Sequence, residues 1–129
     1  LLSYSNFGSS NTESAIKMRK AVEILHAHHP DLLVDGEVQA NFAFTPQLLR
    51  DNYPFSDLAQ RGANTLIFPS LDAGNIAYKL LQSVGGAEAI GPILLGMKKP
   101  VHILQLGSSV REIVNMVAIG VADAQIAGK

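Results

Sequence analysis

One stretch, residues 91–116, constrains the fold of this chain more than any other. It reads GPILLGMKKPVHILQLGSSVREIVNM, in which two short apolar runs, residues 93–95 and 101–104, flank a turn that contains glycine, lysine and proline. Each run is too short for a helix, so each is predicted to be a buried strand. Ser109 and Glu112 then stand at the spacing of a capping box, which predicts the start of a long helix.

The rest of the chain alternates short apolar runs with amphipathic stretches. Further strands are expected at residues 1–5, 31–34 and 65–68, and helices over residues 13–28, 46–52, 76–84 and 109–126. Apolar runs without polar alternation are typical of strands that helices cover on both faces. The sequence therefore predicts the α/β class, as a three-layer α/β/α sandwich with a mostly parallel sheet. The last two strands are joined too closely for a crossover helix, so they are expected to pair antiparallel or to lie side by side at an edge.

The composition excludes several classes of function. The chain has 129 residues, with 10 basic and 11 acidic side chains, so it gives no electrostatic argument for a nucleic acid or a membrane partner. It has no cysteine, which excludes a thiolate metal site and a cysteine nucleophile. No apolar run approaches the ~18 residues of a membrane span, and a cytoplasmic protein is expected. The first residues resemble an internal strand, which predicts a piece of a longer chain.

Two corners that lead into predicted helices are candidate ligand sites. Backbone N–H groups at a helix N-terminus attract small anions, but a capping side chain occupies the same groups. For residues 72–75 the alternatives are an anion nest and an Asp72 cap, and both stay open. For residues 107–109 the same alternatives exist, and Glu112 favours capping. Ligand contacts are expected at Asn75, Gly107, Ser108, Ser109 and Glu112.

Other chemically suggestive side chains have simpler interpretations. Three histidines cluster at the end of the first predicted helix, where a solvated helix end is favoured over a metal site: His26, His28 and His29. His102 is expected to be packed and hydrogen-bonded. Asp35 and Glu37 are expected to be surface carboxylates. We therefore predict no metal site.

Three segments resemble the phosphate acetyl/butyryl transferase family. They are YSNFGS at residues 4–9, DLLVDGEVQ at residues 31–39, and the run at residues 63–104 that begins ANTLIFPSLDAGNIAYKLLQ. Together they cover nearly the whole chain in the family's order. The resemblance implies a sandwich of the isocitrate/isopropylmalate-dehydrogenase-like type. It also implies that residues 1–129 are the C-terminal portion of a longer domain.

The family's enzymes move an acyl group between phosphate and coenzyme A. The resemblance implies that a Ser-Arg-Gly corner, with an Asp five residues beyond the Gly, carries this chemistry. The corresponding residues here are Gln105, Leu106, Gly107 and Glu112. Leucine cannot replace a bidentate guanidinium on a phosphate, and losing such a positioned charge costs ~10²–10³ in rate. Because Arg111 is expected on the wrong side of the corner, we assign no confident catalytic residue and predict poor or absent acyl transfer.

The glutamine at position 105 and the run SSVREIVNMVA at residues 108–118 resemble a subset of the family. This subset is the transferase-like domain at the C-terminus of bacterial NADP-dependent malic enzymes, which oxidatively decarboxylate malate to pyruvate. The resemblance implies a regulatory domain that binds acetyl-CoA or a related acyl-CoA, forms a homo-oligomer of at least two copies, and holds no cofactor itself. The NADP and divalent-metal sites would lie in an N-terminal region outside these residues. Two alternatives stay open: a working phosphate acetyltransferase, and a structural dimerisation domain without a ligand.

Overall fold

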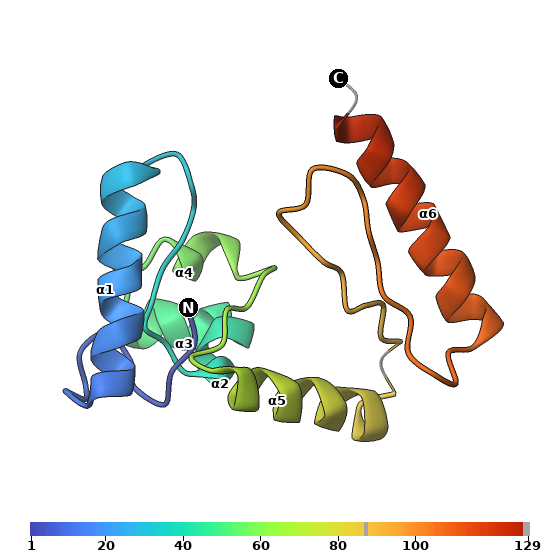
Figure 1. The fold of residues 1–129 in the computed structure, drawn as a ribbon. Helices are drawn as coiled ribbons and strands as arrows, with labels where there is room; N and C mark the ends of the chain where they lie inside the picture. Colours follow the sequence, from blue (N-terminus) through green and yellow to red (C-terminus); the bar gives the residue numbers. More distant parts are fainter. Residues whose placement is uncertain (87, 128–129) are drawn as a thin grey trace. The chain divides into compact units, whose positions relative to one another are not determined.

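The computed structural model describes residues 1–86 and 88–127, which divide into two units, Leu1–Leu80 and Leu81–Lys129. The regular structure of the described residues is helical (Figure 1): α1 (Glu13–His28), α2 (Ala40–Phe44), α3 (Pro46–Asn52), α4 (Leu58–Arg61), α5 (Leu71–Val84) and α6 (Val110–Ala127). Helix α5 crosses the boundary between the units. Among the described residues, no helix has the length and apolar character that crossing a membrane requires.

Helix α1 has the bounds that the sequence predicts. Its apolar residues recur at spacings of three and four, and one face buries Ala15, Met18 and Val22. Helix α3 is also confirmed, with Pro46 at its first position. Proline is tolerated there because a backbone N–H in the first turn would have no hydrogen-bond acceptor within the helix. Helices α5 and α6 are confirmed as well, although α5 begins five residues earlier than predicted, at Leu71.

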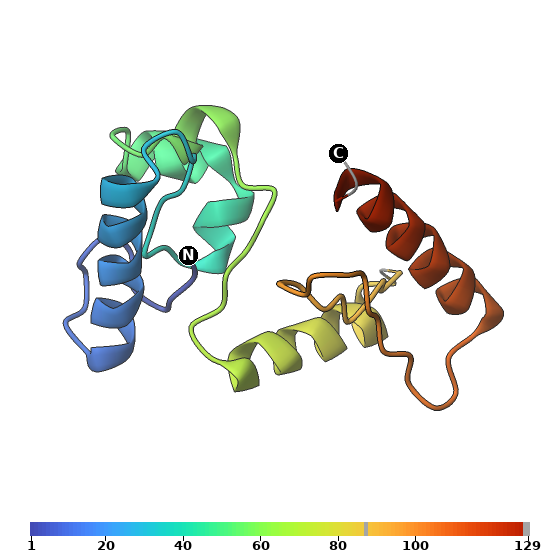
Figure 2. The same ribbon diagram turned by 45° about the horizontal axis from the view of Figure 1, so that its top comes forward.

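The core of the first unit is small and comes from several segments. The chain's first residues lie between α1 and the short helices (Figures 1 and 2), where Leu2 is buried. It joins a cluster of buried side chains from the loops and from α2, α3 and α4: Val38, Ala43, Leu49, Leu58 and Ala59. The sequence did not predict α2 or α4, which have only five and four residues. Their packing against this core compensates for lengths that would be unstable in isolation.

The predicted sheet is wrong, because the described residues contain no strand. The nearest approach is one isolated parallel bridge between Leu2 and Val38. Around it, the Leu2 N–H donates to the Ile67 carbonyl at 2.8 Å, and the Ser3 N–H donates to the Val38 carbonyl at 3.0 Å. These segments meet at single points, whereas a ladder needs successive hydrogen bonds along both partners. The three-layer α/β/α sandwich is therefore not the architecture of the described residues.

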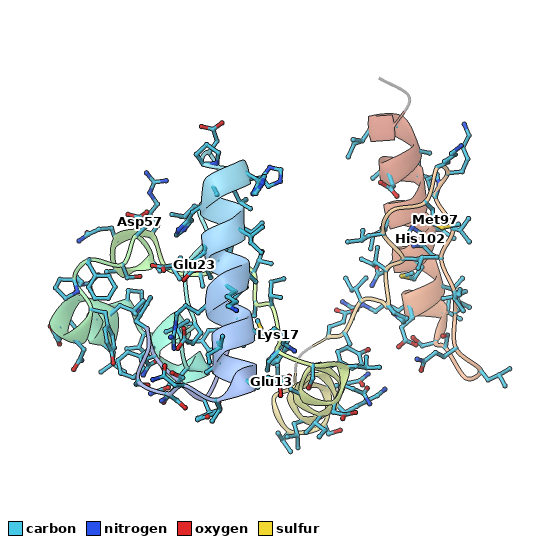
Figure 3. All side chains as sticks on the ribbon, turned by 60° about the vertical axis from the view of Figure 1, so that its left-hand side comes forward. Glu13, Lys17, Glu23, Asp57, Met97 and His102 are labelled. Carbon is cyan, nitrogen blue, oxygen red and sulfur yellow. The ribbon has the colours of Figure 1, made fainter. Side chains whose placement is uncertain are left out.

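The second unit contains the end of α5, an irregular segment and α6. Within its described residues, Met116 on α6 is the one apolar side chain that is buried, with 5% of its surface exposed. His102, labelled in Figure 3, packs near Gly120 of α6, where its Cδ2 atom lies 3.5 Å from the position that a Cβ would take. Both ring nitrogens of His102 are buried and have no hydrogen-bond partner in the described part of the chain. The prediction that His102 is packed is confirmed, and the prediction that it is hydrogen-bonded is wrong.

Candidate functional site

The corner before α6 forms the predicted capping box. The Ser109 N–H donates to the Glu112 carboxylate at 2.6 Å, and the Glu112 N–H donates to the Ser109 hydroxyl at 3.2 Å. Gly107 has a φ of +89°, a conformation that glycine adopts without a steric penalty. The two reciprocal hydrogen bonds satisfy N–H groups that the first turn of a helix leaves unpaired. The geometry thus matches the capping alternative for residues 107–109.

The same hydrogen bonds determine the electrostatics of Glu112. The Ser109 backbone N–H, followed by the Ser109 side chain, lowers the pKa of the Glu112 carboxyl below its ordinary value. A carboxylate whose charged form is stabilised in this way is a weaker proton acceptor. At the position that the resemblance compares with the family's aspartate, this chain therefore has a carboxylate that caps a helix.

The neighbouring side chain, Leu106, is fully exposed to solvent. It lies in the turn before α6, where the Ser108 N–H donates to the Gln105 carbonyl at 3.1 Å. An aliphatic side chain in this place supplies neither charge nor hydrogen-bond donor. Any cation near the corner must therefore come from another position.

Arg111 supplies a cation beside the corner. It lines a shallow hollow of about 460 Å³ together with Glu88, Ser109 and Glu112. Which side of the corner faces a ligand is not shown by this hollow, so the expectation that Arg111 lies on the wrong side stays a prediction. The Arg111 Nε donates to the Glu88 carboxylate at 2.6 Å, so the guanidinium is already paired. With two carboxylates and one guanidinium, the charged side chains that line the hollow carry a net charge of −1.

Asn75 does not lie at a helix start. Helix α5 begins at Leu71, and the Ser70 hydroxyl accepts a hydrogen bond from the Ala73 N–H at 3.2 Å. Ser70 is thus the capping residue and the Asp72 cap is wrong, while the anion nest at residues 72–75 stays a prediction. Asn75 belongs to the first unit and Gly107, Ser108, Ser109 and Glu112 belong to the second. Within the second unit, the structure places these four residues at the corner before α6.

The first unit contains a buried charge cluster that was not predicted from the sequence. Glu37 was expected on the surface, but its side chain is fully buried. Its carboxylate accepts hydrogen bonds from the Ser5 hydroxyl at 2.7 Å and the Gly8 N–H at 2.9 Å. Two further bonds, each 3.0 Å, come from the Arg19 guanidinium. Nothing in the sequence spacing joins α1 to this loop, so no local signal indicated the pair.

Two opposing effects act on the pKa of Glu37. Burial raises it, whereas the hydrogen bonds from Arg19, Ser5 and Gly8 lower it and outweigh burial, which brings the pKa to about 2. Glu37 is therefore a charged group that links the loop containing Ser5 and Gly8 to α1. Its partners leave no free oxygen for a ligand, so we assign it a structural role.

The histidines at the end of α1 are engaged with backbone carbonyl groups. The His26 Nε2 lies 2.8 Å from the Val34 oxygen, and the His28 Nδ1 lies 2.9 Å from the Ile24 oxygen. Within the described residues, no group of three or more histidine and carboxylate side chains has a geometry suited to a metal ion.

The fold resembles solved phosphotransacetylases. The structure of a phosphotransacetylase from Streptococcus pyogenes superposes with a TM-score of 0.87 and 43% identity, over 95% of this chain and 37% of that chain. The EutD phosphotransacetylase from Staphylococcus aureus gives a TM-score of 0.85 and 35% identity, over 98% of this chain and 38% of that chain. These similarities place the fold in the phosphotransacetylase class.

The chain belongs to the phosphate acetyl/butaryl transferase family, whose sequence profile matches residues 1–121. It is 46% identical to the NADP-dependent malic enzyme of Salmonella typhimurium over 97% of this chain, which is 16% of that protein. It is 44% identical to the phosphate acetyltransferase of Acetivibrio thermocellus over 97% of this chain, which is 37% of that protein. The chain therefore spans only a minor part of these relatives. Its similarity to the two groups is nearly equal, so identity alone does not separate them.

Proposed function

We propose that this chain is a regulatory, oligomer-forming domain of an NADP-dependent malic enzyme, which binds acetyl-CoA and does not itself transfer acyl groups. The observation that carries the proposal is the occupancy of the corner by Gln105 and Leu106. The resemblance compares these positions with a serine and an arginine, and Leu106 supplies no cation. Phosphoryl oxygens that are not neutralised by a fixed cation are poorly stabilised during transfer.

The state of Glu112 supports the same proposal. Its carboxylate is bound to the Ser109 N–H, and this bond lowers its pKa. The lowered pKa makes this carboxylate a weaker acceptor for a thiol proton, and the same bond stabilises the start of α6. We therefore assign Gly107, Ser108, Ser109 and Glu112, which all belong to the second unit, as ligand contacts for an acyl-CoA.

The alternative function is a working phosphate acetyltransferase, and one observation favours it. Arg111 lines the same hollow as Ser109 and Glu112, so a guanidinium is present close to the corner. To act on a phosphoryl group, it would have to exchange its 2.6 Å contact with Glu88 for one with the substrate. Arginine is suited to that exchange because its planar fork matches phosphate oxygens.

An assay of the longer protein that contains this chain tests the two functions. Malate-dependent NADP reduction that changes with acetyl-CoA, without acetyl phosphate formation, is the result expected for the regulatory domain. Acetyl phosphate formation from acetyl-CoA that is lost in Arg111→Met, but kept in the control Lys98→Met, would establish the alternative. The Gln105→Ser, Leu106→Arg double variant is expected to gain transfer activity, because it restores the two residue types that the family uses.

Binding and assembly are tested separately. Calorimetry of the longer protein with acetyl-CoA should give saturable heat, and no heat would favour a structural dimerisation domain. Val117 on α6 is 60% exposed, so Val117→Asp should weaken assembly without disturbing a buried core. An unchanged sedimentation profile would count against an oligomer interface on α6. The malate, NADP and divalent-metal sites are proposed to lie outside residues 1–129. The whole enzyme is proposed to be cytoplasmic.

A further inference from the structure

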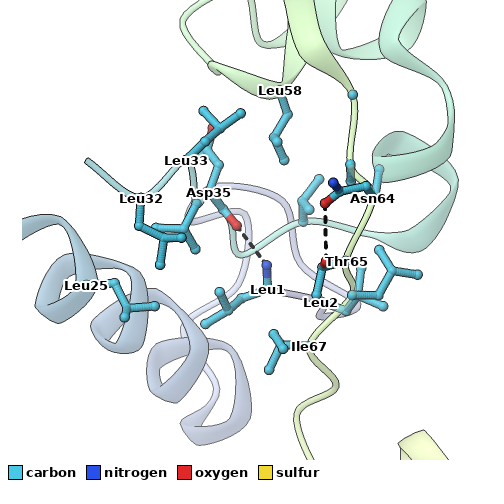
Figure 4. A pocket seen from close by; sticks show the side chains of 16 residues that line it. Leu1, Leu2, Leu25, Leu32, Leu33, Asp35, Leu58, Asn64, Thr65 and Ile67 are labelled. Carbon is cyan, nitrogen blue, oxygen red and sulfur yellow. Dashed lines mark hydrogen bonds between the residues drawn. The ribbon is translucent and has the colours of Figure 1, made fainter. Parts of the chain in front are cut away.

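The apolar cavity of the first unit is poorly suited to select a ligand by its charge. It has a volume of about 340 Å³, and Figure 4 shows leucine side chains pointing into it: Leu25, Leu32 and Leu33. Asp35 is a carboxylate in its lining, and it already accepts hydrogen bonds from the Ser56 hydroxyl at 2.6 Å and from the Gly36 N–H at 2.8 Å. A charged ligand therefore finds its complement elsewhere in the chain.

The hollow beside the corner before α6 is lined by three charged side chains, Glu88, Arg111 and Glu112. Glu112 is engaged with Ser109 in the capping box. Glu88 is paired with Arg111, since its carboxylate lies 2.6 Å from the Arg111 Nε. The guanidinium of this hollow is therefore occupied by a carboxylate of the same unit.

Two side chains of α6 hold the same oxygen of Glu88. The Arg111 Nε donates to the Glu88 Oε1 at 2.6 Å, and the Asn115 Nδ2 donates to that atom at 3.3 Å. Arg111 and Asn115 are four residues apart, so they lie on one face of α6. Together they form a pair of donors that holds one oxygen atom of an anion, and Glu88 supplies that oxygen.

A phosphate oxygen suits the same two donors. The planar fork of arginine pairs with phosphate oxygens as it does with carboxylate oxygens. The Arg111 side chain is 77% exposed and that of Glu88 is 44% exposed, and ion pairs open to solvent contribute little free energy. An incoming phosphate group can therefore displace the carboxylate, although Glu88 stays close by and its charge opposes the anion.

We infer that Glu88 is an internal competitor for phosphate: it occupies the donors of Arg111 and Asn115, and a phosphate-bearing ligand binds this hollow by displacing it. This role rests on the proposed function, in which the ligand is an acyl-CoA, a molecule that carries several phosphate groups. Binding of this kind needs no cation at position 106, where the chain has a leucine. Glu88 thereby sets how much ligand is needed to fill the hollow.

Calorimetric titration of the longer protein that contains this chain with inorganic pyrophosphate tests the role of Glu88. Glu88→Gln keeps the shape of the side chain and removes the competing charge, so it should bind pyrophosphate about three- to fivefold more tightly than wild type. The gain should shrink at high ionic strength, because salt screens exposed charges. The matched control is Asp123→Asn, which removes an exposed carboxylate of α6 that does not line the hollow and should leave the affinity unchanged.

A double-mutant cycle shows whether the gain acts through Arg111. In the Arg111→Gln background, Glu88→Gln should give no gain, because the guanidinium for which the two anions compete is absent. The role of Glu88 is overturned if Glu88→Gln binds pyrophosphate no more tightly than wild type. A gain that Asp123→Asn reproduces, or one that persists in Arg111→Gln, would also overturn it.

Titration with acetyl-CoA separates the role of Glu88 from the proposed function. Glu88→Gln should also bind acetyl-CoA about three- to fivefold more tightly than wild type. If acetyl-CoA gives no heat with either protein but the gain for pyrophosphate is seen, the acyl-CoA function fails and the phosphate site stands. If acetyl-CoA binds and Glu88→Gln changes neither affinity, the acyl-CoA function stands and the role of Glu88 fails.

Discussion

The buried Glu37 gives the sharpest prediction about stability. Glu37→Gln keeps the shape of the side chain but removes the charge that holds Arg19, Ser5 and Gly8. Removing one partner of a buried ion pair typically costs about 3–5 kcal/mol. The Arg19 side chain is 29% exposed and can turn towards water, so we expect the lower end, about 3 kcal/mol. A loss of this size is a large part of the total stability of a small protein.

The same contacts also make the stability depend on pH. A pKa that falls from 4.5 to about 2 on folding corresponds to about 3 kcal/mol, at 1.36 kcal/mol per unit. Because the folded pKa is the lower one, this stability is present above about pH 4.5 and is lost as the pH falls towards 2. The difference between wild type and Glu37→Gln should therefore be largest at neutral pH and should shrink to near zero at about pH 2.

Urea unfolding followed by circular dichroism at a series of pH values measures both effects. The control is Glu23→Gln, which removes an exposed carboxylate from α1 and should change stability by less than about 0.5 kcal/mol. A loss below about 1 kcal/mol at neutral pH, or a loss that does not depend on pH, would refute the assignment of Glu37 as a paired, charged group.

Three further predictions concern single positions. Ser109→Ala should lower the helicity of α6 and reduce the free energy of unfolding by about 1 kcal/mol, because it removes the capping hydroxyl. Ser108→Ala removes no capping hydroxyl and should have neither effect. Equal helicity of the two variants by circular dichroism would contradict the capping box. Met116→Ala should destabilise the second unit by about 2–3 kcal/mol in urea unfolding, whereas Val117→Ala on the exposed side should cost under 1 kcal/mol. Gly36→Ala should lower the thermal midpoint more than Gly86→Ala, because a Cβ at Gly36 would lie 2.5 Å from the Leu1 carbonyl oxygen, whereas none of the described atoms lies within 4 Å at Gly86.

The sequence predicted those elements whose determinants are local. The bounds of α1 follow from the spacing of Ala15, Met18 and Val22, and the start of α6 follows from Ser109 and Glu112. Strands depend on partners distant in the sequence, and apolar composition cannot show whether successive hydrogen bonds will form. Residues 1–5 and 65–68 were predicted as strands from their apolar composition. In the structure a single backbone hydrogen bond joins them, from the Leu2 N–H to the Ile67 carbonyl.

The candidate site shows the same division. The capping role of Glu112 was readable from its distance to Ser109, because both ends of the interaction lie within one turn. The placement of Arg111 was not readable, because it depends on Glu88, which lies 23 residues earlier. Glu37 was misplaced because most carboxylates are exposed, and only its contacts with Arg19 and the backbone of Gly8 make burial tolerable.

The burial of Met116 has a consequence for the motions of α6. In the described part of the second unit, this is the one apolar side chain withdrawn from water, whereas α1 buries three of its residues. The free energy needed for α6 to detach transiently should therefore be smaller than for α1. Amide protons along α6 should therefore exchange with deuterium well before those of α1. Any partner that binds α6 would then meet a helix that detaches transiently from the rest of its unit.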